Sequence, residues 1–104
     1  MLNIQTHIKK LINKHSVLLF IKGSKNKPQC GFSTSVINIL TSLSIDFHCV
    51  NVLENHTIRD GIKKYSNWPT IPQLYIDQVF IGGCDIVKQL YKSGDLQNKL
   101  NSQL

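Results

Sequence analysis

The sequence predicts an α/β fold in which one four-stranded mixed sheet is flanked by helices, in the order αβαβαββαα. Segments with apolar residues at helical spacing alternate with short runs rich in β-branched and aromatic residues. A helical segment separates the first two runs, which is the connection that parallel strands need. A length of 104 residues suits one such layered unit, so we expect residues 1–104 to form a single domain.

The first half of the chain alternates clearly between the two periodicities. Apolar residues from Leu2 to Ile12 recur at near-helical spacing, whereas the run that ends at Ile21 is almost entirely apolar. Lysine, asparagine and proline then mark a loop over 23–29. The expected elements are a helix that runs to about 15, a strand over 16–21, a helix that begins near 31, and a strand over 45–53.

The second half begins with a helix that Asn55 or Thr57 can cap. We expect this helix to end before Trp68-Pro69, because the residue before a proline disfavours helical geometry. Two short runs, 74–76 and 79–81, predict a hairpin that turns at 77–78.

A fourth helix follows the glycines at 82–83, and we expect Asp85 to be its N-cap. Gly94 ends that helix, and Asp95 begins a short last one. We expect only the last few residues of the chain to fray.

The composition is that of an ordinary globular chain, with 41% hydrophobic and 17% charged residues. Basic residues outnumber acidic ones by 12 to 6, but the lysines are scattered and Arg59 is the only arginine. We therefore expect no nucleic-acid partner. The longest apolar run is far shorter than a membrane span, and no signal segment follows Met1, so the expected location is the cytoplasm, with no membrane partner.

The three cysteines, Cys30, Cys49 and Cys84, match neither a disulfide framework nor a zinc-binding spacing. At least one thiol is unpaired, which points to reactivity or metal binding. Cys49 lies within an expected strand, and its expected role is core packing. The four histidines share no metal-ligand spacing, and no role is assigned to them.

Cys30 follows the 23–29 loop and lies at the start of a predicted helix. Free N–H groups and the helix dipole stabilise a thiolate there, and we expect Lys22, Lys25 and Lys27 to add positive potential. Both effects lower the pKa of this thiol. The alternative is a small, buried, inert side chain, since free cysteine is often buried.

Cys30-Gly-Phe-Ser33 occupies the place of a thioredoxin-type Cys-x-x-Cys motif after the first strand. Ser33 stands where the second cysteine would be. A serine hydroxyl cannot resolve a mixed disulfide, so an adduct on Cys30 must be released by an outside thiol or by another cysteine of the chain.

The chain resembles the monothiol glutaredoxins of the CGFS type along nearly its whole length. The resemblance rests on four segments in the family's order and spacing: 20–23 (FIKG), 28–33 (PQCGFS), 67–73 (NWPTIPQ) and 81–86 (IGGCDI). It implies a thioredoxin-like fold, glutathione binding, and a homodimer that shares a [2Fe-2S] cluster and transfers it to iron–sulfur apoproteins. It also suggests heterodimers with BolA-family proteins.

The resemblance assigns glutathione-binding roles to five residues besides Cys30. Lys22 and Arg59 are expected to bind one glutathione carboxylate, although each is otherwise an ordinary surface charge. The family places a cis peptide before Pro72, so that the backbone of Ile71 pairs with glutathione as an added strand does. The remaining two, Cys84 and Asp85, open a helix where a second carboxylate can be held.

Several of these assignments have alternatives. Asp85 can pair with the glutathione amine, act only as a helix cap, or do both. Cys84 either faces the site or is a spectator thiol. Trp68 is expected to support the loop before Pro72, and its alternatives are a partly buried packing residue or a direct contact with the ligand.

The expected function is a glutathione-dependent [2Fe-2S] carrier in iron–sulfur cluster biogenesis, in which Cys30 of each of two chains is a cluster ligand. The rival is a glutathione-dependent thiol oxidoreductase that removes glutathione from protein mixed disulfides through the same thiol. A third class is a basic interaction module with an inert thiol.

Overall fold

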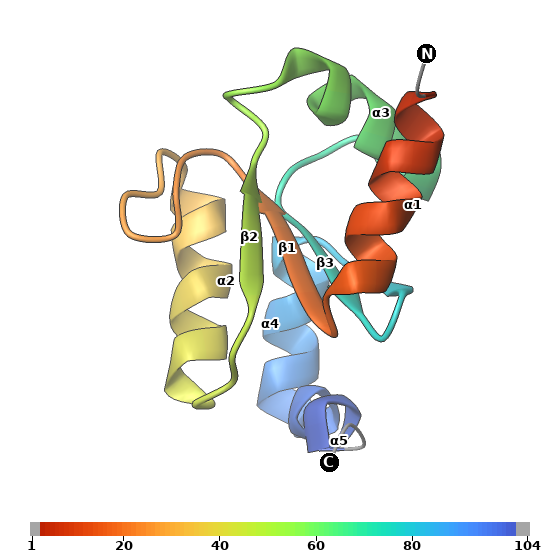
Figure 1. The fold of residues 1–104 in the computed structure, drawn as a ribbon. Helices are drawn as coiled ribbons and strands as arrows, with labels where there is room; N and C mark the ends of the chain where they lie inside the picture. Colours follow the sequence, from red (N-terminus) through yellow and green to blue (C-terminus); the bar gives the residue numbers. More distant parts are fainter. Residues whose placement is uncertain (1–2, 102–104) are drawn as a thin grey trace.

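A four-stranded sheet of order β2-β1-β3-β4 runs through the centre of the computed structural model, which describes residues 3–101 (Figure 1). The order of elements along the chain is the one predicted. The elements are α1 (Ile4–Lys14), β1 (Val17–Ile21), α2 (Gly31–Ser42), β2 (His48–Asn51), α3 (His56–Ser66), β3 (Gln73–Ile76), β4 (Val79–Gly82), α4 (Cys84–Ser93) and α5 (Asp95–Asn101).

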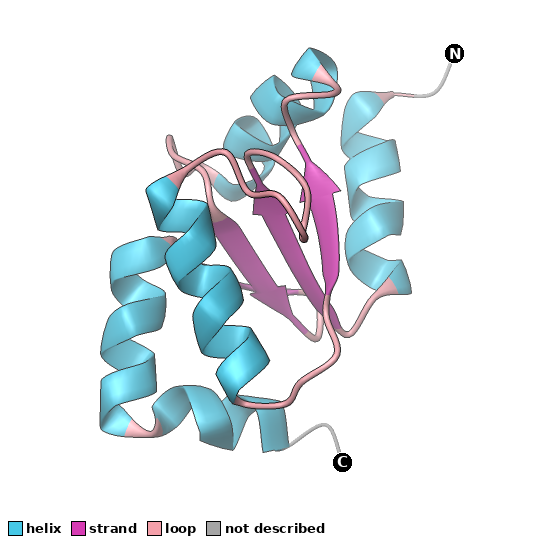
Figure 2. Cartoon of the chain, turned by 90° about the vertical axis from the view of Figure 1, so that its left-hand side faces the viewer, coloured by secondary structure: helices cyan, strands magenta, loops and turns pink. Residues whose placement is uncertain are grey.

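The sheet is mixed, because β1 pairs parallel with β2 and antiparallel with β3, and β3 pairs antiparallel with β4. Helices cover both of its faces (Figure 2). One apolar cluster joins the sheet to α2, α4 and α5, and a second joins it to α1 and α3. The central strand β1 is buried along its whole length and contributes to both clusters. The carboxyl end of β1 is therefore held firmly, and so is the start of the segment that follows it.

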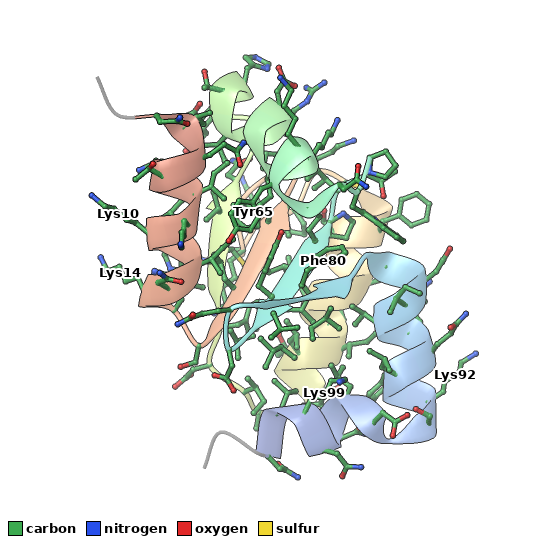
Figure 3. The ribbon with its side chains drawn as sticks, turned by 90° about the vertical axis from the view of Figure 1, so that its right-hand side faces the viewer. Lys10, Lys14, Tyr65, Phe80, Lys92 and Lys99 are labelled. Carbon is green, nitrogen blue, oxygen red and sulfur yellow. The ribbon has the colours of Figure 1, made fainter. Side chains whose placement is uncertain are left out.

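Helix α1 shows the polarity that its sequence periodicity predicts. Ile8 and Ile12 are buried against the sheet side, whereas Lys10 and Lys14 extend outward from the helix (Figure 3). Tyr65 of the neighbouring helix α3 and Phe80 of β4 both contact the ring of Tyr75. Leu2 lies outside the described residues. The fraying expected for the last few residues concerns positions that lie partly outside them.

One cap and one strand differ from the sequence expectations, and the choice between two residues for another cap is now settled. Asn55, and not Thr57, caps α3, because its side-chain oxygen accepts hydrogen bonds from the N–H groups of Thr57 and Ile58. Gly83 is the N-cap of α4, so the prediction that Asp85 caps this helix was wrong: Asp85 lies inside the first turn. The strand expected over 45–53 is ladder-paired only over 48–51.

The segment between β1 and α2 folds back on itself as a small hairpin. Ser24 and Lys27 exchange backbone hydrogen bonds, and the N–H of Gln29 donates to the carbonyl of Lys22 over 2.8 Å. Gly23 has a φ of 98°, and a Cβ there would lie 2.5 Å from the backbone nitrogen of Gln29. Only glycine fits this crossing of the two arms. The hairpin returns the chain to the end of β1, where Cys30 begins α2.

Candidate functional site

A cavity of about 510 Å³ opens where the end of β1 meets the first turns of two helices. Its wall includes Lys22 after β1, Cys30 and Phe32 at the start of α2, and Lys63 near the end of α3. The segment 68–72 and the start of α4, 83–86, complete the wall. Segments far apart in the sequence thus meet at one end of the sheet.

Cys30 is the N-cap residue of α2, and its backbone is extended, with φ −144° and ψ 132°. Its carbonyl accepts hydrogen bonds from the N–H and the hydroxyl of Thr34, at 2.9 and 3.0 Å. Its side chain makes no capping bond in the way that a serine would. The N–H groups of Phe32 and Ser33 in the first turn nevertheless act on its sulfur.

Partial burial of the Cys30 thiol by itself raises its pKa, but opposing interactions outweigh this effect. The N–H groups of Ser33 and Phe32 and the Ser33 hydroxyl stabilise the thiolate, and the charge of Lys22 adds to them. The pKa of Cys30 therefore lies below its ordinary value, as the helix-start argument predicts.

The loop lysines do not act on Cys30 as expected from the sequence. Among the charged groups of the described residues, Lys22 is the one that lowers the pKa of this thiol. The Lys25 ammonium turns toward the start of β2, where it donates to the carbonyl of Phe47 over 2.9 Å and lies 4.0 Å from the centre of its ring. The expectation that Lys25 and Lys27 stabilise the Cys30 thiolate was therefore wrong, because sequence proximity does not fix the direction of a lysine side chain.

Ser33 is fully buried and has a structural role that the sequence comparison with Cys-x-x-Cys does not reveal. Its hydroxyl oxygen accepts a hydrogen bond from the N–H of Lys22 over 3.2 Å. This bond ties the first turn of α2 to the end of β1. Ser33 thereby holds the backbone of Lys22 close to Cys30, whose thiolate is stabilised by the charge of Lys22.

The charged groups of the cavity are two lysines and one carboxylate, Lys22, Lys63 and Asp85. Lys63 was not singled out from the sequence. Because it lies one helical turn beyond Arg59, helical spacing from that arginine could have found it. Arg59 itself is half-buried on α3 and is not part of the cavity wall.

The 68–72 segment supplies an aromatic and backbone wall. The Ile71-Pro72 peptide is cis, as the family resemblance implied. Gln73 is buried, and its side-chain amide donates to the carbonyls of Trp68 and Thr70 at 3.1 and 3.2 Å, which secures the segment. A Cβ on Gly83 would lie 3.2 Å from the indole nitrogen of Trp68, so a larger residue there would require the indole to shift by a few tenths of an ångström.

The two remaining cysteines have different settings. Cys84 is buried and belongs to the cavity wall, so it faces the site together with Cys30. Cys49 lies in β2, packs against the core cluster of α2 and α4, and has a pKa that burial raises to about 11. Within residues 3–101, no group of three or more histidine, cysteine or acidic side chains is arranged to hold a metal ion.

The comparisons with known proteins agree on one family. The glutaredoxin family model matches residues 17–81. A monothiol glutaredoxin of rice, named S7 and chloroplastic, is 53% identical over 95 residues, covering 91% of this chain and 56% of its own length. A probable monothiol glutaredoxin 2 of Rickettsia typhi is 48% identical over 96 residues, covering 92% of this chain and 86% of its own. The solution structure of reduced poplar apo GrxS14 has a TM-score of 0.84 at 52% identity, covering 95% of this chain and 91% of that one.

The chain spans about half the length of the rice relative. The chloroplastic location in that relative's name does not fit an expectation of a purely cytoplasmic protein. In the part of the chain that the structure describes, no helix has the length and apolar character needed to cross a bilayer. The cytoplasmic location stays a prediction, as does the extent of the single domain over residues 1–104.

Proposed function

The chain belongs to the glutaredoxin family as one of its monothiol members, and on this premise we propose that it carries a [2Fe-2S] cluster with the help of glutathione. In this proposal the cluster is cargo, accepted from a donor and handed on to iron–sulfur apoproteins. One observation carries the proposal: Cys30, whose thiolate its neighbours stabilise, lies in the wall of a cavity that has the charges of a glutathione site.

Glutathione is an extended tripeptide with two carboxylates, one amine and one thiol. The cavity offers the two ammonium groups of Lys22 and Lys63 for one carboxylate. The start of α4 at Cys84 and Asp85 offers free N–H groups for the other, and the Asp85 carboxylate can pair with the amine. The backbone of Ile71, in the wall between them, supports pairing with the peptide. The donor set therefore fits the ligand.

The ligand count supports sharing of the cluster between two chains. A [2Fe-2S] cluster takes four thiolates. Cys30 is the cavity thiol with a lowered pKa, Cys84 is buried, and Cys49 lies outside the cavity wall. Two Cys30 thiolates and two glutathione thiolates complete the set in a symmetric homodimer. A BolA-family protein in place of the second chain belongs to the same proposal.

The rival activity, removal of glutathione from protein mixed disulfides, needs the same thiol and the same cavity. We expect it to be slow, because the 23–29 hairpin next to Cys30 is fixed by its own hydrogen bonds and leads directly into the N-cap. Nothing in this arrangement orients a second glutathione for attack on a mixed disulfide.

Anaerobic purification with glutathione, followed by visible absorption spectroscopy, tests the proposal. A cluster carrier is coloured, and its colour requires both glutathione and Cys30. A Cys49→Ser variant is the matched control and should stay coloured. A colourless protein that turns over a glutathionylated peptide on the order of 1–10³ times per second would instead establish the oxidoreductase.

A further inference from the structure

Two imidazole rings stack on each other outside the cavity that contains Cys30. His15 is the C-cap residue of α1, and His48 is the first residue of β2. Their ring centroids are 4.0 Å apart and their planes differ by 5°. Because β2 is an edge strand, this pair lies at the border of the sheet, and His48 is exposed there.

Positive groups approach the pair from two elements. Lys14 precedes His15 at the end of α1, and Lys25 comes from the tip of the 23–29 hairpin. Although His48 is exposed overall, the groups that cover part of it remove water and lower its pKa, and His15, Lys14 and Lys25 lower it further by charge repulsion. No carboxylate is among the groups that act on His48 within the described chain.

A hollow of about 420 Å³ lies beside His48. Lys25 lines it and is held in place by the carbonyl and the ring of Phe47, so its ammonium has N–H groups left for a ligand. Ser24 and Asn51 add polar atoms to the wall. Glu54 is the one acidic side chain that lines this hollow in the described residues.

The geometry argues against a metal ion as the occupant. The lone pairs of imidazole nitrogens lie in the ring planes, so two parallel stacked rings direct them side by side and not toward one ion. A third ligand is also lacking, since the described residues contain no cluster of three potential metal ligands. The surplus of positive groups instead favours an anion.

We propose that the His15–His48 pair, together with Lys14 and Lys25, forms a binding site for a doubly charged tetrahedral oxyanion of the sulfate or phosphate-ester class. Without the anion, the neighbouring ring at 4.0 Å and the two ammonium groups oppose protonation of His48. A bound dianion instead favours protonation, because it accepts charge-assisted hydrogen bonds from the protonated rings. Binding and proton uptake are therefore coupled. Inorganic ions and phosphate esters share this chemistry, and the hollow beside His48 leaves room for the larger of the two.

Sulfate is the first probe, because it is a dianion throughout the range in which histidine titrates. We expect it to bind roughly tenfold more tightly at about pH 6 than at about pH 8. In NMR spectra the ring protons of His15 and His48 should shift together and saturate, whereas those of His56 should not. Titration with chloride at the same ionic strength separates site binding from general screening.

Matched variants locate the site. His48→Gln and Lys25→Met should each weaken sulfate binding several-fold, whereas His56→Gln and Lys27→Met should leave it unchanged, because the latter pair changes the same residue types outside the cluster. Glutathione affinity should be unaffected in all four variants. The anion site can therefore fail its test while the proposed function stands, and the proposed function can fail while the anion site stands.

A small phosphate monoester used in place of sulfate distinguishes the two sources of the oxyanion. Tighter binding of the ester, with shifts of Ser24 and Asn51 signals, would show that the hollow holds its organic part. Equal affinity would indicate a site for the inorganic ion. Equal shifts of all four histidines, or equal effects of chloride and sulfate, would overturn the proposal.

Discussion

Cys30 and Cys49 are the same side chain in two settings, and their thiols have opposite properties. Cys30 lies at the N-terminus of α2, where backbone N–H groups outweigh the effect of burial and lower its pKa. Cys49 lies in the middle of β2, where burial raises its pKa to about 11 although the charge of Lys25 acts against this. A nearby lysine thus does not replace lost hydration, whereas N–H groups directed at the sulfur do.

The largest expected effect follows from replacing each thiol in turn. Cys30→Ser should abolish [2Fe-2S] cluster assembly and dimer formation, because serine is a poor ligand for this cluster and Cys84, the other thiol of the cavity wall, is buried. Cys49→Ser should assemble the cluster as the unmodified chain does, and Cys84→Ser should largely retain it. Visible absorption after anaerobic assembly provides the measurement. Loss of the cluster in Cys49→Ser would break the distinction between the two settings.

The rate of alkylation compares the two thiols directly. Only thiolates react, so at neutral pH Cys30 should react on the order of 100-fold or more faster than Cys49. As pH rises, the rate at Cys30 should level off first, because its pKa lies below that of an ordinary cysteine thiol. Peptide mass spectrometry after short iodoacetamide pulses measures both sites in one sample, and the unfolded protein gives the reference rates. Equal rates in the folded chain would contradict the electrostatic account.

Charges around Cys30 should matter next. Lys22→Ala and Lys63→Ala are each expected to weaken glutathione binding by roughly 1–3 kcal/mol, the range for a lost charge-assisted contact. Arg59→Ala should have a smaller effect, because that side chain is not in the cavity wall. Isothermal titration calorimetry distinguishes these cases. If Arg59→Ala weakened binding the most, the carboxylate-binding role that the family resemblance implies for Arg59 would be correct. The cavity wall would then have to rearrange when glutathione binds.

The smallest expected effect is on the free energy of unfolding, and it has opposite signs for serine at positions 30 and 49. Cys30 makes no side-chain capping bond, and serine is a preferred N-cap, so Cys30→Ser should stabilise the fold by about 0.5–1 kcal/mol. Cys49→Ser should destabilise it by about 1 kcal/mol, because a polar group replaces a partly buried thiol packed against the core. Urea unfolding of both variants is the test. Destabilisation by Cys30→Ser would mean that the thiol itself holds the helix start.

The sequence predicted the fold well, because periodicity and turn chemistry report on backbone geometry directly. The order of elements, the helix start at Gly31 and the hairpin turn at Asp77-Gln78 were all confirmed, and both turn residues have positive φ. The limits of β2 and the cap of α4 were not. Apolar character continues beyond the four paired residues of β2, and Gly83 occupies the cap position ahead of Asp85.

The site was predicted in outline only. Cys30, Lys22 and Ile71 meet in the cavity wall, as the motifs implied. The direction of Lys25 depends on how side chains far apart in the sequence pack together, which no local pattern contains. Lys63 lies in the cavity wall one helical turn beyond Arg59, so helical spacing could have indicated it. The stacked pair of His15 and His48 was missed because the two residues are 33 positions apart in the sequence and the fold of the sheet brings them together.

Native mass spectrometry of the anaerobically assembled protein tests the central claim most directly. The account predicts one species with two chains, one [2Fe-2S] cluster and two glutathione molecules, which separates into single chains when iron is chelated. The same preparation of Cys30→Ser should contain single chains alone. A complete cluster on one chain without glutathione, or a cluster that survives in Cys30→Ser, would contradict the account.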